Sequence, residues 1–216
     1  QVVDYRAKMP EFSYSADDLM TYFEDKKISS LVLVNPDNPT GNYIPYKDCL
    51  RLAQWCEERD IMFILDESFI DFSCEHPTFI CNDVLEQFGC LVVIKSISKS
   101  YGVPGLRLGI LASSNANLMV NIRRSVSIWN ITSFAEFFLQ ILGKYERCYQ
   151  QAMEDFRIER KRFQEELSAI KFLRVIPSEA NYFLCEVLNP HTPRELAVQL
   201  LKQHNILIKD CSSKCN

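Results

Sequence analysis

A lysine flanked by serines, with an arginine close behind it, is the group of residues in this chain best suited to chemistry. Lys99 lies between Ser98 and Ser100, and Ser96 and Arg107 belong to the same segment. Lysine forms Schiff bases with aldehydes, whereas hydroxyl groups and a guanidinium bind a phosphate dianion through charge-assisted hydrogen bonds. The segment therefore predicts a site for a molecule with an aldehyde and a phosphate. Pyridoxal 5′-phosphate carries both groups.

Two further polar residues, Asn38 and Asp66, resemble Lys99 in their placement. Each of the three follows a short apolar run, at residues 31–34, 61–65 and 91–95. Such runs predict buried strands, and in open α/β sheets ligands bind at the carboxyl ends of the strands. We therefore expect Asn38, Asp66 and Lys99 to lie at one edge of a sheet.

Helical patterns separate these strands. Helices are predicted at residues 15–25, 45–60 and 82–88, the first from an S-x-x-D start at Ser15 and the second from Pro45 in its first turn. Continuous apolar strands that alternate with helices are typical of a parallel sheet covered on both faces. The fold class predicted is α/β, with a mostly parallel sheet sandwiched by helices.

The pattern changes in the second half of the chain. A strand at 106–112 and a helix at 117–127 precede a long amphipathic stretch at 134–167, beyond which strands at 172–175, 181–187 and 206–209 accompany a helix at 193–204. We predict part of a large cofactor-binding domain at residues 1–135 and part of a small α+β C-terminal domain at residues 136–216. The first residues, 1–5, are predicted as a strand already in progress.

The amino-acid composition argues against some classes of binding partner. A net charge of −4 argues against nucleic acid or an acidic membrane as partner, because both need a concentrated basic patch. The local basic cluster at residues 157–162 alternates with acidic residues and predicts a solvated helix face. No apolar run reaches the roughly 18 residues of a membrane span. The cysteines, nine in number and without a Cys-x-x-Cys, predict neither disulfides nor a metal site and suit a reducing cytoplasm.

Three motifs together resemble the fold type I, class I/II pyridoxal-phosphate enzymes. They are Asn35 to Gly41, Asp66 to Phe69, and Ser96 to Lys99 with Gly105 to Gly109. Within that family the closest resemblance is to histidinol-phosphate aminotransferases and threonine-phosphate decarboxylases. It extends from about Asp4 to the C-terminus.

The resemblance implies a role for each candidate site residue. Lys99 would form the Schiff base with the cofactor and move protons at the substrate Cα, and Asp66 would pair with the pyridinium nitrogen. Asn38 would donate a hydrogen bond to the 3-oxygen of the ring. The cofactor phosphate would be held by Ser96, Ser98 and Arg107, the last favoured because a buried guanidinium without an anion is costly. Turn capping is the alternative for Asp66 and Ser96.

Phe69 departs from the family pattern, which commonly places a tyrosine there as a second donor to the 3-oxygen. The same phenylalanine is frequent in the decarboxylase branch, so it leaves both reactions open.

Trp129 and Asn130 match a part of the family that lines the substrate pocket, and a core tryptophan at the domain junction is the alternative. Asn181 matches a position near the substrate carboxylate.

The resemblance implies a cytoplasmic, homodimeric aminotransferase that takes an amino acid or an amino-acid-derived amine, including phosphorylated ones, as donor and a keto acid as acceptor. A threonine-phosphate-type decarboxylase is the alternative. Against the family pattern the chain looks truncated at both ends, because a glycine-rich phosphate turn and a C-terminal carboxylate-binding arginine are missing. A non-catalytic fragment is therefore a second alternative, and we expect this chain alone to bind the cofactor weakly.

Overall fold

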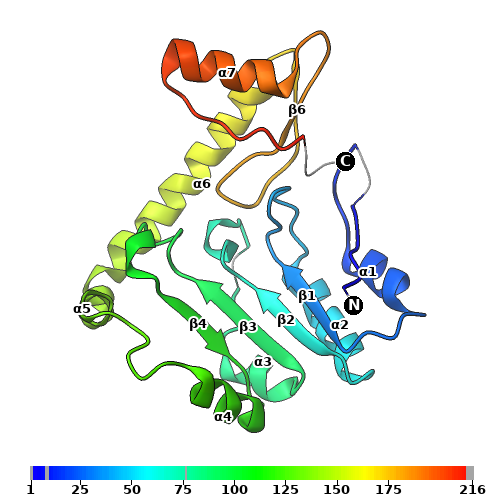
Figure 1. Ribbon diagram of the computed structural model, residues 1–216, viewed down its shortest axis with the longest axis vertical. Coiled ribbons are helices and arrows are strands. Elements are labelled where there is room, and N and C mark those ends of the chain that lie inside the picture. The colour runs from blue at the N-terminus through cyan, green and yellow to red at the C-terminus, as the bar shows by residue number, and fades with distance from the viewer. Residues whose placement is uncertain (1, 8–9, 76, 213–216) are drawn as a thin grey trace.

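A four-stranded sheet lies at the centre of the computed structural model, which describes residues 2–7, 10–75 and 77–212 (Figure 1). Its strands, in order across the sheet, are β1 (Ser30–Val34), β2 (Met62–Asp66), β3 (Leu91–Ser96) and β4 (Gly109–Ala112). The first three are parallel, and β4 runs antiparallel to β3. The predicted α/β fold with a mostly parallel sheet is confirmed.

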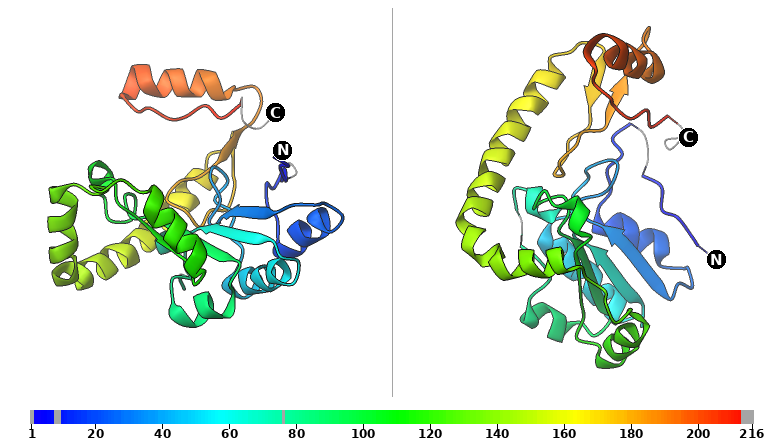
Figure 2. Two further views of the ribbon diagram at one scale, coloured as in Figure 1. Left: turned by 60° about the horizontal axis from the view of Figure 1, so that its bottom comes forward. Right: turned by 60° about the vertical axis from the view of Figure 1, so that its left-hand side comes forward.

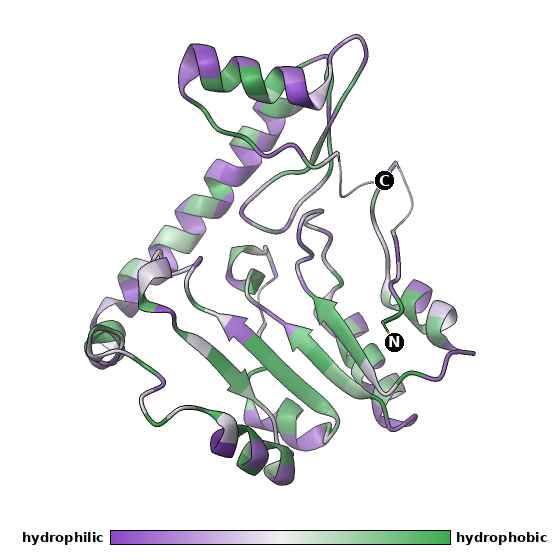
Figure 3. Cartoon of the chain, in the orientation of Figure 1, coloured by the Kyte–Doolittle hydropathy of each residue, from purple (hydrophilic) through white to green (hydrophobic). Residues whose placement is uncertain are grey.

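Helices α1 (Ala16–Phe23), α2 (Tyr46–Glu57) and α3 (Asn82–Gln87) pack on one face of this sheet. Alternate strand residues such as Leu33 and Phe63 point into that core, because successive side chains of a strand face opposite sides. Figure 3 shows the continuous apolar character of the strands. The helices thus fix the sheet, and with it the strand ends that the site depends on.

The long helix α6 (Glu146–Ser168) connects the sheet region to the rest of the chain (Figure 2). It is preceded by α4 (Ala116–Ser125) and α5 (Ser133–Leu142), and followed by the antiparallel pair β5 (Leu173–Val175) and β6 (Cys185–Val187) and by α7 (Pro193–His204). We call β5, β6 and α7 the C-terminal unit. The predicted boundary between residues 135 and 136 falls inside α5 and stays a prediction. None of the helices described is both long and apolar enough to cross a bilayer.

Four of the predicted strands differ from the structure, and one of these, predicted at 106–112, is a strand only at Gly109–Ala112. Residues 2–5 and 206–209 are not strands, and of 181–187 only Cys185–Val187 is one; residue 1 lies outside the described part. An apolar run becomes a strand only where another strand offers its backbone groups for pairing. Residues 206–209 follow α7 with exposed side chains, and residues 178–182 pack against the loop after β1 instead.

The basic cluster of α6 is not uniformly solvated, which corrects the prediction. Arg160 is 7% exposed. Its guanidinium donates hydrogen bonds to the backbone oxygens of Phe72 at 2.9 Å and Ala180 at 3.2 Å, and pairs with the Glu179 carboxylate at 2.8 Å. Charge alternation along a helix cannot reveal that one of its faces packs against segments distant in sequence. Arg160 therefore joins α6 to the segment after β2 and to the segment before β6.

Candidate active site

The carboxyl ends of the three parallel strands bring the predicted site segments together. Val34, Asp66 and Ile94 lie side by side in the strand register. Asn38 lies in the loop after β1, and Lys99 lies in the turn after β3. In Figure 1 these strand ends point toward α6 and the C-terminal unit.

The loop at residues 35–41 is closed by its own side chains. The buried Asn35 amide donates to the backbone oxygen of Ile44 at 2.9 Å and accepts from the Ile44 backbone N–H at 2.8 Å. The backbone N–H of Asp37 donates to the oxygen of Asn42 at 2.8 Å. Asn38 is exposed, and its side chain has no hydrogen bond within the described residues. The loop therefore presents an unengaged amide at the strand ends.

Gly41 is where this loop meets the chain ahead of β6. It has a φ of +78°, and a Cβ placed there would lie 2.1 Å from Ser178 Oγ and 2.9 Å from Ser178 Cα. The backbone N–H of Glu179 donates to the Gly41 oxygen at 3.0 Å. Only glycine satisfies both the backbone conformation and the close approach.

Gly41→Ala is expected to destabilise the fold more than Gly102→Ala. Both glycines have positive φ, but nothing lies within 4 Å of a Cβ at Gly102. The left-handed conformation alone costs an alanine about 1–2 kcal/mol, and the overlap with Ser178 adds about 1–3 kcal/mol. Urea unfolding of the two variants measures the difference. Equal losses would show that residues 178–182 do not pack on the loop.

Asp66 fills the turn-capping role and still keeps one oxygen unengaged. Its Oδ1 accepts from the Ser68 backbone N–H at 2.8 Å, while Oδ2 has no partner among the residues described. The neighbouring Glu67 is structural, since its two oxygens accept from the Phe79 N–H at 2.8 Å and the Thr78 hydroxyl at 2.6 Å. Burial raises the pKa of Glu67. Of the two carboxylates, Asp66 is the one with an oxygen that has no hydrogen-bond partner among the described residues.

Lys99 and Lys95 differ in what engages their amines. Lys95 Nζ forms an ion pair with Asp71 at 2.6 Å, with both side chains largely buried. Lys99 is exposed, and its Nζ contacts the ring of Phe69, with 5.2 Å to the centroid, but forms no hydrogen bond or ion pair within the described chain. Lys99 therefore has the amine that is available for reaction.

The segment after Lys99 is attached to α6. Ser100 is buried, and the ring of Tyr101 stacks on the ring of Tyr149 with centroids 4.1 Å apart and planes 1° apart. Tyr149 belongs to the first half of α6. The stacking ties the turn that carries Lys99 to the long helix.

The residues predicted to bind the cofactor phosphate differ in their hydrogen bonds and exposure. Ser96 Oγ accepts from the Ser98 backbone N–H at 3.4 Å, which agrees with a turn-capping role. Arg107 has a left-handed φ of 56°, is exposed, and donates to the Pro104 oxygen at 3.2 Å. The argument from a buried guanidinium was wrong, because Arg107 is solvated. Its assignment, like those of Ser96 and Ser98, stays a prediction.

The candidate substrate residues are all exposed. Trp129 is 91% exposed, so the alternative of a core tryptophan is wrong for the described chain. Asn130 is also exposed, and no hydrogen bond or ring contact described here joins either residue to Lys99 or Asp66. Asn181 lies in the segment that packs on the loop after β1. All three assignments stay predictions.

Tyr182 is a residue near the site that the sequence did not reveal. Its hydroxyl donates to the backbone oxygen of Asp37 at 2.7 Å, and its ring packs edge-on against Phe69 with centroids 5.2 Å apart. The two hydrogen-bonded residues are separated by 145 positions in the chain. The only available signal was that Tyr182 directly follows Asn181.

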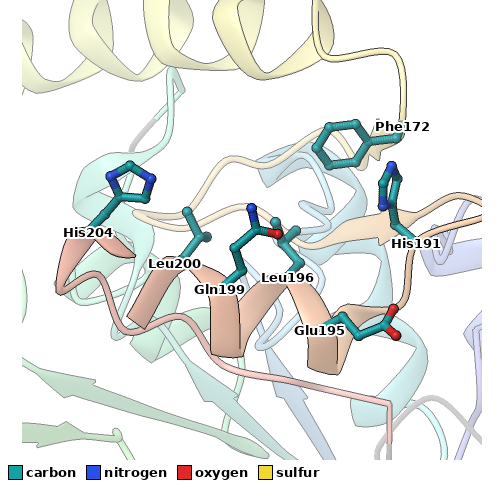
Figure 4. Close-up of a pocket in the computed structure, with 7 residues that line it drawn as sticks. All are labelled: Phe172, His191, Glu195, Leu196, Gln199, Leu200 and His204. Atoms are coloured by element: carbon teal, nitrogen blue, oxygen red, sulfur yellow. The ribbon is translucent and has the colours of Figure 1, made fainter. Parts of the chain in front are cut away.

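Of two cavities in the described part of the chain, one reaches the site. A cavity of about 210 Å³ against α7 involves none of the candidate residues (Figure 4); its lining is Phe172, His191, Glu195, Leu196, Gln199, Leu200 and His204. A cavity of about 1110 Å³ runs along β1 and extends to Asp37, Pro39 and Thr40. The larger one therefore borders both sides of Asn38.

Comparisons with known proteins agree with these observations. The family model described as aminotransferase class I and II matches residues 1–214. A CMP-5′-(3-aminopropyl)phosphonate synthase from Streptomyces rubellomurinus is 33% identical, over 97% of this chain and 33% of that protein. A threonine-phosphate decarboxylase from Salmonella typhimurium is 33% identical, over 86% of this chain and 50% of that protein.

A solved histidinol-phosphate aminotransferase from Clostridium acetobutylicum superposes with a TM-score of 0.81 at 30% identity. The match covers 93% of this chain and 59% of that one. The chain thus spans between a third and about three fifths of the length of these relatives.

Proposed function

Because this chain belongs to the class I and II aminotransferases, whose members use pyridoxal phosphate, we propose that Lys99, Asp66 and Asn38 bind that cofactor and that the whole protein is an aminotransferase. The observation that carries the proposal is the unengaged amine of Lys99 at the same sheet edge as the unengaged Oδ2 of Asp66. The proposed donor is an amino acid or an amine derived from one, and the proposed acceptor is a keto acid.

The donor set fits pyridoxal phosphate in its chemistry. An amine suits the aldehyde, a carboxylate suits the protonated ring nitrogen, and an amide N–H suits the ring 3-oxygen. Hydroxyls and a guanidinium suit the phosphate. In this proposal the phosphate partners are Ser96, Ser98 and Arg107.

When bound, pyridoxal phosphate supplies an aldehyde that captures amines and a ring that withdraws electrons from the substrate Cα. Lys99 Nζ would hold the aldehyde group and, when free, would move a proton at the substrate Cα. Asp66 Oδ2 would pair with the protonated ring nitrogen. Asn38 would donate to the 3-oxygen of the ring, and Phe69 provides an apolar surface beside the Lys99 amine.

A phosphate or phosphonate group on the substrate is part of the proposal. The names of all three relatives contain such a group: an aminopropylphosphonate, threonine phosphate and histidinol phosphate. Those names concern those proteins, and they support the same substrate class here.

Decarboxylation is the second candidate reaction. Phe69 and the threonine-phosphate decarboxylase relative both favour it. The two reactions share the capture of the substrate amine and differ in which bond at Cα is broken. Three expectations stay predictions whichever reaction occurs: the homodimer, the cytoplasmic location and the domain boundary after residue 135.

The products separate the two reactions. The full-length protein, loaded with pyridoxal phosphate, is incubated with histidinol phosphate, threonine phosphate or their unphosphorylated counterparts. We expect a carbonyl product and the aminated cofactor, with the phosphorylated substrates at least about tenfold better because charge-assisted hydrogen bonds are strong. Release of carbon dioxide in proportion to amine would contradict transamination and support decarboxylation. Lys99→Ala is the control for background reaction.

A further inference from the structure

Tyr182 contacts the loop that carries Asn38 at one defined atom. Its hydroxyl donates to the backbone oxygen of Asp37, and the same oxygen accepts from the Gly41 backbone N–H at 2.8 Å. The carbonyl of Asp37 belongs to the peptide group that continues into Asn38. A hydrogen bond to this oxygen therefore restricts the rotation of the peptide that orients Asn38.

Tyr182 also contacts the other side of the site. Its ring packs edge-on against Phe69, and the Phe69 ring faces Lys99 Nζ. The side chain therefore spans from the Asn38 loop to the surface beside the candidate reactive lysine.

The surroundings of the Tyr182 hydroxyl favour its protonated form, which is the form that donates. Burial raises its pKa, and the carboxylates of Asp37 and Asp66 raise the pKa further by opposing a second negative charge. A protonated phenol has only one proton to donate, and Asp37 O receives it. The direction of the pKa shift is thus consistent with the hydrogen bond to Asp37 O.

We propose that Tyr182 is a positioning residue that acts through Asn38: its hydroxyl fixes the Asp37–Asn38 peptide so that the Asn38 amide is held ready to donate to the 3-oxygen of the cofactor. This inference rests on the proposed function. Tyr182 lies on the segment before β6. Its hydroxyl would support the donor Asn38 in a site where Phe69 has no hydroxyl to donate to the 3-oxygen.

Tyr182→Phe tests the proposal, because it removes the hydroxyl and keeps the ring that packs on Phe69. The measurement is the pH midpoint of the visible absorbance of the chain saturated with pyridoxal phosphate. A donor to the 3-oxygen stabilises its anionic form, so weakening that donor raises the midpoint. We expect a rise of about 0.5–1 unit, the size of one weakened hydrogen bond.

A double-mutant cycle shows whether Tyr182 acts through Asn38. Asn38→Ala is expected to raise the midpoint by itself, and adding Tyr182→Phe to that variant is expected to raise it no further, since coupled residues are not additive. Tyr22→Phe is the matched control, because Tyr22 also donates to a backbone oxygen, that of Asp4 at 3.1 Å. The control should lower thermal stability at most and leave the midpoint unchanged.

Two results would overturn the inference and leave the proposed function standing. One is an unchanged midpoint in Tyr182→Phe; the other is an equal shift with and without Asn38. In both cases the wild-type protein would show the visible absorbance, and Lys99→Ala would lack it. A full-length wild-type protein whose absorbance at saturating cofactor does not differ from that of Lys99→Ala would overturn the proposed function and this inference together.

Discussion

Lys99→Ala is expected to abolish the visible absorbance that the wild-type chain acquires with saturating pyridoxal phosphate, and Lys95→Arg is expected to retain it. The amine of Lys99 is exposed and unpaired within the described chain, whereas that of Lys95 is held by Asp71 at 2.6 Å. Arginine keeps the charge beside Asp71 but cannot form a Schiff base, which makes Lys95→Arg a matched control. Titration with cofactor, followed by absorbance, measures both variants.

The same substitution should affect turnover of the full-length protein. Loss of the group that moves the proton at Cα typically slows catalysis by about 10²–10⁴-fold. Visible absorbance that survives in Lys99→Ala and disappears in Lys95→Arg would assign the cofactor to Lys95 instead. A tight complex with the wild-type chain would contradict the expectation of weak binding.

Arg160→Met is expected to destabilise the fold strongly, and Arg162→Met on the same helix is expected to do little. Arg160 has a 6% exposed side chain and is paired with Glu179. Removing its charge leaves two backbone oxygens without their donor and leaves Glu179 with the Cys74 backbone N–H alone, at a cost of about 3 kcal/mol. This cost in free energy is at the low end of the range for a broken buried ion pair, because the Glu179 side chain is 32% exposed.

Arg162 serves as the control because its pairs with Glu159 and Glu166 are exposed. Its side chain is 58% exposed, and such surface pairs contribute about 0–1 kcal/mol. Urea unfolding of both variants, monitored by circular dichroism, measures the difference in the free energy of unfolding. If the two cost the same, the contacts of Arg160 with Phe72 and Ala180 do not stabilise the fold.

Local patterns in the sequence correctly predicted those structural features that depend on residues adjacent in the chain. The helix at 193–204 has the bounds predicted for it, since Thr192 and Glu195 form a capping box and Asn205 ends the helix in a left-handed conformation. The strand ends at Asp66 and near Lys99 follow from apolar runs broken by polar residues. The expectation that Asn38, Asp66 and Lys99 share one edge of the sheet needed only the rule for parallel strands.

What the sequence could not predict depends on contacts between distant segments. Arg160 looks like its solvated neighbours in sequence, and its burial is decided by Phe72 and Ala180. The roles of Tyr182 and Gly41 likewise depend on the packing of residues 178–182 against the loop after β1. Arg107 was judged by its charge, but its exposure could only come from the structure.

The long helix α6 contacts the rest of the protein at several points along its length. Tyr149 stacks on Tyr101 near one end, and Arg160 binds Phe72 and Ala180 about 16 Å farther along the axis, three turns on and on the same side. Between them, the ring of Phe156 packs against Phe72, and Arg157 donates to the Asp71 backbone oxygen at 3.2 Å. The helix thus links the turn that carries Lys99 to the segment before β6, and we expect Arg160→Met to increase hydrogen exchange at that turn.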